Sequence, residues 1–593
     1  MKHIQFRSTC WTLLLIFSLS TMTHAGVISS QLKSVLDDAD PNEEIAVIVE
    51  LNGKVNRKKY KNLKKKLRRL KLLQELKVKA AENESTLKEY LLGSGSKRMK
   101  NLWIINGFSI HAKPSAIKKL AKKKLVKEIR INKPIPLATS SASITSTTQW
   151  NLTMVGADDA WAKGHTGQGV VIASMDSGID YQHEQLNGSW RGGTNSWFDP
   201  HGEHLLPYDV NGHGTQTMGI MASQNINGTT IGMAPSAQWI AVKIFNDAGE
   251  AWASDIHEGF QWLIDPDSNI NTDDAPDIVN NSWGFPETEN MCDTEFQVDI
   301  QTLREMEISV VFSAGNQGAG PSSISPANNA GAFSVGEIDE NAIITSTSSQ
   351  GPSSCISSSV YPSVTSPGYL VNTTDLTFGG LFADSTVLAN GTSFAAPHAA
   401  GAMALLLSAH PDLTVDELEA AIRQSSMDLG EAGEDNVYGS GLINVASALN
   451  AIGQLEQCTD SDNDGYFVES SCSQPIDCDD STSEVYPGAQ EVILDGIDQN
   501  CDGYDLTITI TKALYNSGKD KLLVHATSSY GSNAGLSVDI PGVGIKTMTW
   551  KANKNRWQKN INKISTKGFQ ADTSAPVTVF GAEGEAGRII TLK

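Results

Sequence analysis

Three polar residues far apart in the chain have the chemistry of a nucleophilic hydrolase. Asp176 lies in Met175-Asp-Ser-Gly178, His213 in Asn211-Gly-His-Gly-Thr215, and Ser393 in Asn390-Gly-Thr-Ser-Phe-Ala-Ala-Pro-His398. A serine hydroxyl is a poor nucleophile at neutral pH, so it needs a nearby base and a third group that fixes the tautomer of that base. We therefore predict that Ser393 is the nucleophile, His213 the base and Asp176 the orienting carboxylate.

Attack by a serine on a carbonyl creates an oxyanion, which needs a hydrogen-bond donor. Asn316 follows the apolar run Val310 to Ala314 and is the predicted donor. Ser393 is expected to open a buried helix, Thr392 to His410, whose N-terminus favours negative charge.

Between Asn151 and Gly453, short β-rich apolar runs alternate with segments of helical periodicity. The strands are predicted at Val170 to Met175, Trp239 to Phe245, Ile278 to Trp283 and Val310 to Ala314, with helices such as Ser254 to Ile264 and Phe296 to Met306 between them. This alternation predicts an α/β fold with a doubly wound parallel sheet. The carboxyl ends of such strands are where active sites collect, which suits Asp176 and Asn316.

Together and in this order, these motifs resemble the subtilisin-like serine peptidases, and Val279-Asn-Asn-Ser-Trp-Gly284 is most similar to the bacillopeptidase F-like branch. The resemblance covers Asn151 to Gly453. It implies an endopeptidase that hydrolyses proteins or peptides through an acyl-enzyme, with Ser282, Trp283 and Gly284 pairing with the substrate main chain. Gln216 departs from the many relatives that have a second histidine there, and side-chain specificity is not carried over.

The first 25 residues have the organisation of a signal peptide. Lys2 and Arg7 precede the apolar stretch Trp11 to Ser20, and Thr23-His-Ala25 is a small-x-small cleavage site. We expect a secreted, extracellular protein, with the periplasm or cell surface as alternatives, and no transmembrane segment after signal removal. We also expect a monomer.

Residues 26–140 form a basic block, with 27 Lys and Arg against 11 Asp and Glu, in a chain of net charge −21. Apolar periodicity predicts a β-α-β-β-α-β order, including a strand over Leu102 to Ile105, in a ferredoxin-like α+β arrangement. Residues 26–138 resemble the inhibitory prosegment of subtilisin-type enzymes, which implies a self-processed zymogen cut near residues 134–148. A solvated lysine-rich helix and a nucleic-acid-binding tail are the alternatives, but we expect no nucleic-acid partner.

The segment 456–505 is rich in aspartate and has too few apolar residues for a core. It resembles the Asp/Cys metal-binding motif of bacterial secreted proteins, and its carboxylates favour calcium in a structural role. It is not an EF-hand, because Ser471 stands where a bidentate Glu is required. An acidic spacer without an ordered ion is the alternative. The candidate metal ligands are Asp460, Asp462, Asp464, Asp477, Asp479, Asp480, Asp495, Asp498 and Asp502.

The remaining predictions concern domains and cysteines. The expected domains are 1–25, 26–138, a peptidase domain at 139–455, the acidic segment at 456–505 and a small all-β sandwich at 506–593. Loss of the signal peptide leaves six cysteines, which suit disulfides in an oxidising compartment, such as Cys292 with Cys355 and two bridges further on. A catalytically idle homologue that acts as an extracellular binding or adhesion module is the alternative function.

Overall fold

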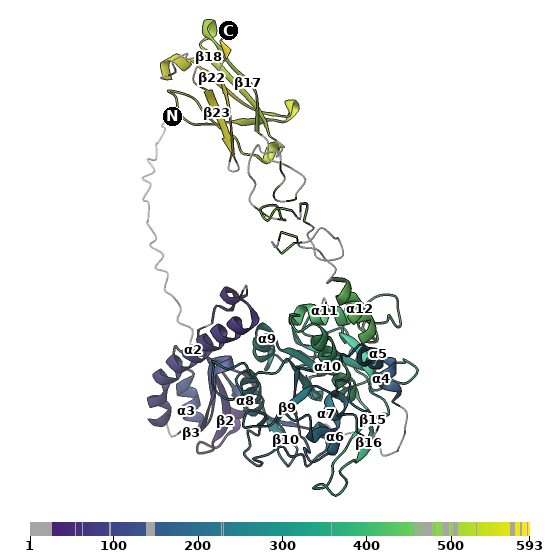
Figure 1. The fold of residues 1–593 in the computed structure, drawn as a ribbon. Coiled ribbons are helices and arrows are strands. Elements are labelled where there is room, and N and C mark those ends of the chain that lie inside the picture. Colours follow the sequence, from purple (N-terminus) through teal and green to yellow (C-terminus); the bar gives the residue numbers. More distant parts are fainter. Residues whose placement is uncertain are drawn as a thin grey trace, which may run out of the picture. The chain divides into compact units, whose positions relative to one another are not determined.

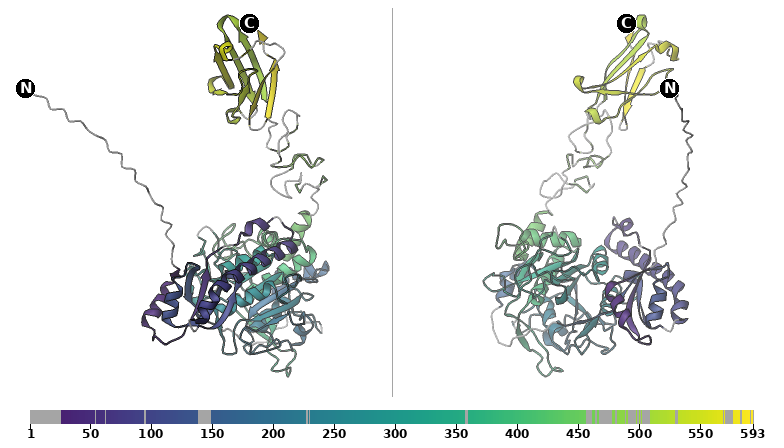
Figure 2. Two further views of the ribbon diagram at one scale, coloured as in Figure 1. Left: turned by 90° about the vertical axis from the view of Figure 1, so that its left-hand side faces the viewer. Right: turned by 180° about the vertical axis from the view of Figure 1, so that it is seen from behind.

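The computed structural model describes most of residues 26–593 and divides the chain into two compact units, Met1–Asn450 and Ala451–Lys593 (Figures 1 and 2). The stretches outside the described residues are 1–25, 54, 62, 94–95, 138–148, 227, 229, 357–358, 456–460, 463–464, 467–476, 480, 488, 490–496, 498, 500, 502–507, 529–530, 568, 570–575, 582–583, 590 and 593. The predicted signal peptide and residues 138–148 of the predicted cleavage region therefore lie outside them. No helix within the described part of the chain is long and apolar enough to cross a membrane.

The centre of the first unit is a seven-stranded sheet in the order β14-β13-β12-β11-β7-β9-β8. All its neighbouring strands are parallel. The strands are β7 (Val171–Asp176), β8 (Trp197–Phe198), β9 (Gln238–Lys243), β11 (Ile278–Asn281), β12 (Ser309–Ser313), β13 (Phe333–Ile338) and β14 (Val364–Pro367). Most of these strands are buried along their length without alternation, because helices cover both faces of the sheet. The predicted doubly wound α/β fold is confirmed.

Two helix pairs cover this sheet. α8 (Ala253–Ile264) and α9 (Gln297–Glu305) share a core with Ala173 and Met175 of β7. On the other side, α7 (His213–Ala222) contacts α10 (Thr392–Ala409), a helix that is buried along almost its whole length because it is rich in alanine. The outer elements are α4 (Trp150–Met154), α5 (Ala157–Ala162), α6 (Glu184–Asn187), α11 (Val415–Ser425) and α12 (Val445–Leu455), with the hairpin β15 (Val371–Thr374) and β16 (Thr386–Ala389).

The N-terminal region, residues 26–137, packs beside α8 and α9 (Figure 1). Its elements are β1 (Val27–Ile28), α1 (Ser30–Asp38), β2 (Ile45–Leu51), α2 (Lys65–Gly93), β3 (Lys97–Leu102), β4 (Gly107–Ala112), α3 (Pro114–Leu120), β5 (Val126–Ile131) and β6 (Pro134–Pro136). The sheet order β5-β2-β4-β3 with antiparallel neighbours is the predicted ferredoxin-like arrangement, to which β1 adds an edge strand.

One local prediction in this region is wrong. Residues 103–105 form a 3₁₀ turn, not part of a strand, and β3 lies before it. The chain reverses at Asn106, which has a left-handed backbone with φ of 53°. Ile104 and Ile105 are buried in the core that α8 and α9 share, so their apolar character reflects this packing and not a strand.

The second unit contains the predicted all-β sandwich. One sheet has the order β21-β22-β18-β17-β25 and the other β20-β19-β23-β24. Its strands are β17 (Ile508–Asn516), β18 (Lys521–Ser528), β19 (Ser537–Asp539), β20 (Lys546–Thr547), β21 (Thr549–Lys551), β22 (Arg556–Asn562), β23 (Pro576–Gly581), β24 (Gly584–Ile589) and β25 (Thr591–Leu592). Trp557 is buried in the core between the sheets, and Trp550 packs against it.

Candidate active site

The side chains of Asp176 and His213 meet at the carboxyl end of β7. Asp176 is the last residue of that strand, and His213 is the first residue of α7. The His213 Nδ1 atom lies 2.8 Å and 3.0 Å from the two carboxylate oxygens of Asp176. Both side chains are almost completely buried. This contact holds the proton of the neutral imidazole on Nδ1 and leaves Nε2 as the basic nitrogen.

Glycines allow this close approach. Gly212 precedes His213 with a φ of 96°, a left-handed conformation that favours glycine. A Cβ atom on Gly214 would lie 2.1 Å from the Gly178 carbonyl oxygen, so any side chain there would separate the two segments. The glycines of both motifs are therefore explained by the contact between β7 and α7.

Ser393 is the second residue of α10 and is partly exposed. In this structure its hydroxyl donates to the Ser282 carbonyl oxygen at 3.2 Å, and among the described residues it has no hydrogen bond to His213. The next residue, Phe394, packs its ring against the imidazole of His213 with ring centroids 5.6 Å apart. Ser393 is therefore next in the chain to a residue that packs against the imidazole, while its hydroxyl is held by the Ser282 carbonyl oxygen.

Asn316 is tied to the same turn. Its Oδ1 accepts hydrogen bonds from the Thr392 backbone N–H at 3.0 Å and from the Thr392 hydroxyl at 2.9 Å. The Thr392 hydroxyl also accepts from Gly315 N–H at 3.1 Å. Asn316 is exposed, and its amide nitrogen, which no hydrogen bond within the described part of the chain engages, can act as a donor.

Burial and Asp176 act in opposite directions on His213. Burial alone lowers the pKa of this imidazole, but the charge and hydrogen bond of Asp176, with a contribution from Asp209, raise it above the ordinary histidine value. His398, at the end of the serine motif, differs. Burial lowers its pKa to about 4, and it lies between Asn151 and the Phe394 carbonyl oxygen as a neutral structural residue.

The predicted substrate segment has mixed contacts. Ser282 donates its hydroxyl to the Ser393 carbonyl oxygen at 2.7 Å and so ties the end of β11 to α10. Trp283 is buried among Phe285, Phe296 and Phe312. A Cβ atom on Gly284 would lie 2.7 Å from Ile324 Cδ1. Residues 282–284 therefore border the site with their backbone, while the Trp283 side chain faces the core.

One strand near the N-terminal region, β10, was not predicted from the sequence. β10 (Glu250–Trp252) pairs with β6 in an antiparallel register that matches Ile135 to Ala251. Leu137 N–H continues the pairing by donating to Gly249 O at 3.0 Å. Ile135 is 1% exposed and belongs to the core beneath the α8 side of the sheet. A three-residue strand gives almost no periodicity signal, and for this reason the sequence did not reveal β10.

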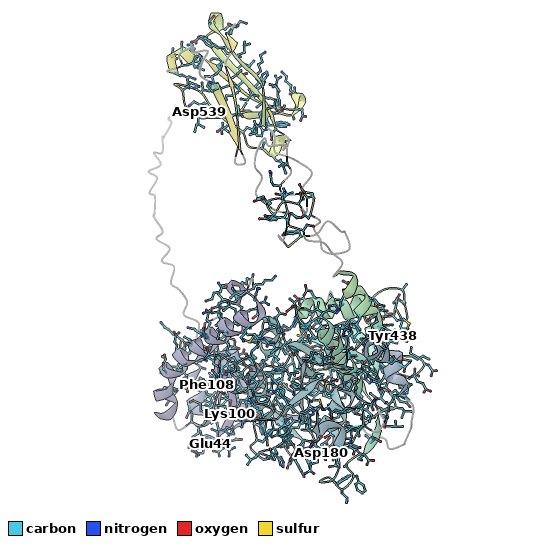
Figure 3. The ribbon with its side chains drawn as sticks, viewed as in Figure 1. Glu44, Lys100, Phe108, Asp180, Tyr438 and Asp539 are labelled. Carbon is cyan, nitrogen blue, oxygen red and sulfur yellow. A yellow bond between two sulfur atoms is a disulfide. The ribbon has the colours of Figure 1, made fainter. Side chains whose placement is uncertain are left out.

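Ion pairs hold the basic N-terminal region against an acidic surface, as its charge predicts. Lys100, which Figure 3 labels, contacts Asp255 at 2.8 Å and Glu258 at 2.7 Å. Arg130 Nε donates to both Glu295 oxygens, at 2.8 Å and 2.7 Å. The other pairs of the described residues are Arg57 with Glu305, Lys65 with Asp277, Arg68 with Glu307, Arg69 with Asp273, Lys77 with Asp265, and Lys133 with Asp293 and Glu287.

The structure describes only some of the candidate metal ligands. Asp460, Asp464, Asp480, Asp495, Asp498 and Asp502 lie outside the described residues. Asp477 is 2% exposed, its Oδ1 accepts the Asp479 N–H, and its Oδ2 is buried without a hydrogen-bond partner among the described residues. Such an orphaned carboxylate oxygen suits a cation.

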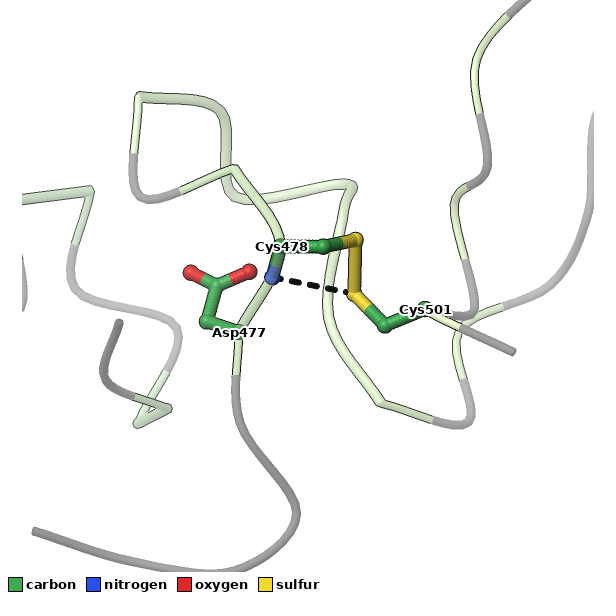
Figure 4. A group of neighbouring side chains, drawn as sticks. All are labelled: Asp477, Cys478 and Cys501. Carbon is green, nitrogen blue, oxygen red and sulfur yellow. Dashed lines mark hydrogen bonds between the residues drawn. A yellow bond between two sulfur atoms is a disulfide. The ribbon is translucent and has the colours of Figure 1, made fainter. Parts of the chain in front are cut away.

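Asp477 lies next to the disulfide between Cys478 and Cys501 (Figure 4). These sulfurs are not thiolates and offer no soft-metal ligation, so the carboxylates are the available ligands. The disulfide between Cys292 and Cys355 forms as predicted.

Comparison with known proteins identifies the class. Residues 167–441 match the model of the Subtilase family, and residues 477–505 match one described as "Putative metal-binding motif". The chain is 34% identical over 300 residues to Subtilisin Savinase of Lederbergia lenta, covering 50% of this chain and 97% of that protein. It is 32% identical over 327 residues to Alkaline protease of Shouchella clausii, covering 54% and 76%. The chain belongs to the subtilase family of serine endopeptidases.

Among the relatives, the match to Bacillopeptidase F of Bacillus subtilis (strain 168) is longer. It is 32% identical over 419 residues and covers 64% of this chain, but only 28% of that relative. The resemblance to the bacillopeptidase F-like branch, first drawn from Val279 to Gly284, is therefore confirmed, although the matched region is less than a third of the relative.

Proposed function

We propose that this protein is a secreted serine endopeptidase that cleaves proteins through an acyl-enzyme and is made as a self-processed zymogen. The observation that carries the proposal is the contact of His213 Nδ1 with both oxygens of buried Asp176, beside α10, the helix whose second residue is Ser393. A buried imidazole with one nitrogen fixed by a carboxylate has its other nitrogen available as a general base.

The chemistry assigns one task to each residue. Ser393 Oγ attacks the peptide carbonyl carbon while its proton passes to His213 Nε2, and the carbonyl oxygen takes the negative charge. Asn316 Nδ2 and the N-terminus of α10 stabilise that charge. His213 then gives the proton to the leaving amine as the C–N bond breaks. Water repeats the sequence on the acyl-enzyme and releases the acid.

Residues 26–138 serve in this proposal as the inhibitory prosegment. β6 pairs with β10 and Leu137 continues the pairing at Gly249, as an extended substrate would add to a sheet edge. Cleavage near residues 134–148 would separate the N-terminal region covalently from the peptidase domain, and the ion pairs would keep it bound as an inhibitor. The acidic surface and the basic block explain why the two parts associate before cleavage.

We also propose that the segment 456–505 binds calcium in a structural role. Asp477 and other carboxylates of this segment would hold the ion, because hard oxygen ligands suit calcium. Ion binding would then stabilise a segment that has few apolar residues. In thermal unfolding of the full chain, a chelator is expected to lower the melting temperature of the transition that belongs to the unit Ala451–Lys593. Added calcium is expected to restore that temperature. An unchanged transition would contradict the ion.

The main test is expression of the wild type beside Ser393→Ala, with a fluorophosphonate label and N-terminal mass measurement as readouts. We expect the wild type to lose its N-terminal region and take up the label, and the variant to stay full length beyond the signal peptide and unlabelled. A full-length, unlabelled wild type that binds cells or matrix would instead support an idle adhesion module.

A further inference from the structure

A buried carboxylate without a cationic partner lies beneath the turn that carries Ser393. Glu337 belongs to β13, is 0% exposed and forms no ion pair within the described part of the chain. Burying a carboxylate is costly unless hydrogen bonds or an opposite charge compensate it. The contacts that compensate Glu337 therefore indicate what this residue holds in place.

Three donors surround the Glu337 carboxylate. Its Oε1 accepts the backbone N–H of Gly391 at 2.9 Å. Its Oε2 accepts the hydroxyls of Thr345 at 2.7 Å and Thr347 at 3.0 Å. The carboxylate thus links β13 and the loop after it to the residue two positions before Ser393.

The backbone around Gly391 leaves little room. Gly391 has a φ of 129°, and its N–H is shared between Glu337 and the Gly368 carbonyl oxygen, which lies 3.0 Å away. A Cβ atom on Gly368 would lie 2.8 Å from Glu337 Cγ and 2.9 Å from the Gly391 carbonyl oxygen. The Glu337 side chain therefore packs directly against the backbone of Gly368 and Gly391.

The turn from Gly391 to Ser393 determines the positions of two groups of the proposed reaction, the nucleophile Ser393 and the oxyanion donor Asn316. Thr392, directly after Gly391, holds the Oδ1 atom of Asn316 through its N–H and hydroxyl. Ser393 follows as the nucleophile. A shift of Gly391 would move the attacking oxygen and the oxyanion donor together, and a displacement of about 1 Å at a reacting group can cost about 10²-fold in rate.

We propose that Glu337 is a positioning residue of this peptidase, which fixes the Gly391 to Ser393 turn by accepting the Gly391 N–H while the two threonine hydroxyls anchor its other oxygen. This inference rests on the proposed function of Ser393. Burial raises the pKa of Glu337 above the ordinary carboxyl value, against the opposing hydrogen bonds of Thr345, Gly391 and Thr347.

Three substitutions separate positioning from general stability. Glu337→Gln keeps the length and an oxygen acceptor for Gly391, while the threonine hydroxyls rotate to accept from the new amide. Glu337→Asp is one methylene shorter and does not reach Gly391 and the threonines together. Glu337→Ala removes the acceptor. Glu419→Ala is the matched control, because Glu419 on α11 is also a buried glutamate but pairs with Arg304 of α9 instead of with the Gly391 N–H.

The assay is kcat and KM of the processed enzyme on a peptide p-nitroanilide, with the melting temperature of each variant. We expect Glu337→Gln to keep kcat within about threefold, and Glu337→Asp and Glu337→Ala to lose roughly 10- to 100-fold in kcat with KM nearly unchanged. Glu419→Ala should lower the melting temperature and leave kcat unchanged.

Each alternative result is informative. Wild-type kcat in Glu337→Asp, or an equal loss in Glu337→Gln and Glu337→Ala, would overturn the positioning role. If Glu337→Ala does not fold, the comparison of Glu337→Gln with Glu337→Asp decides. A wild type that takes up no fluorophosphonate refutes the proposed function itself, which is a different outcome from an active wild type whose kcat is insensitive to position 337.

Discussion

The Arg130 to Glu295 pair gives a quantitative test of how the N-terminal region is held on the peptidase domain. The Arg130 side chain is 16% exposed and the Glu295 side chain 10% exposed, and Arg130 Nε lies within 2.8 Å of both carboxylate oxygens. Glu295 also accepts from His257 Nε2 at 3.0 Å. Arg130→Ala therefore leaves a buried carboxylate with one partner instead of two.

The expected cost follows from this burial. Removing one member of a buried ion pair costs about 3 to 5 kcal/mol, and the remaining His257 contact places this case near 3 kcal/mol. That free energy corresponds to a roughly 10²-fold larger population of molecules in which the N-terminal region has opened. Arg130 also lies 3.5 Å from Glu50, but both residues belong to the N-terminal region, so this contact does not hold the region on the peptidase domain.

The assay uses full-length chains that carry Ser393→Ala, so that no self-processing occurs. Added thermolysin cleaves the N-terminal region only when it opens, and at low protease the cleavage rate follows the open population. We expect Arg130→Ala to be cleaved roughly 10²-fold faster than its parent.

The control is Lys97→Ala, which removes the surface contact to Glu44 within the N-terminal region, with Lys97 67% exposed, and should change the rate by less than about twofold. Equal rates for the parent and Arg130→Ala would refute the reasoning that this pair holds the two parts together.

The remaining predictions concern catalysis, latency and pH. Asp176→Asn should lower kcat about 10⁴-fold in hydrolysis of a peptide p-nitroanilide while the chain stays folded, because the imidazole loses its tautomer; unchanged kcat would contradict the assigned role. Ile135→Asp puts a charge into the buried side of the β6 pairing and should increase fluorophosphonate labelling of uncleaved zymogen, whereas the exposed Pro136→Asp should not. Burial lowers the pKa of His257, but Asp299 and Glu295 raise it to about 9, so its contribution to the unfolding free energy is complete below its unfolded pKa of about 6.5 and is lost as pH rises through about 9. Burial raises the pKa of Glu295, but Arg130 and His257 lower it to about 2, so its contribution to the unfolding free energy is lost as pH falls through about 2. Urea unfolding of the Ser393→Ala chain should show an unfolding free energy that falls from pH 7 to 9.5. A rise over that range, or the same pH slope in a chain that also carries His257→Gln, would count against the role of His257.

The sequence by itself determined the class of fold and the chemistry of the site. Continuous apolar runs in β9 and β12, and the mainly apolar β7, alternate with helical segments, and a parallel sheet covered on both faces buries such strands. Asp176, His213 and Ser393 were recognisable because their glycine and alanine neighbours permit close backbone contact, and close contact leaves a local motif in the chain. The charge of residues 26–140 also predicted association with an acidic surface, since Coulomb attraction depends on composition more than on detailed geometry.

Only the tertiary structure decided which distant groups meet. β10 has three residues and no periodicity, so its pairing with Ile135 depends on the position of α8 and not on its own sequence. Glu337 reads as one acidic residue in an apolar strand, and its contact with Gly391 arises because β13 passes beneath the start of α10. Local pattern records the preference of a segment for helix, strand or turn, whereas a contact between segments is fixed by the packing of the whole core, which no single segment encodes.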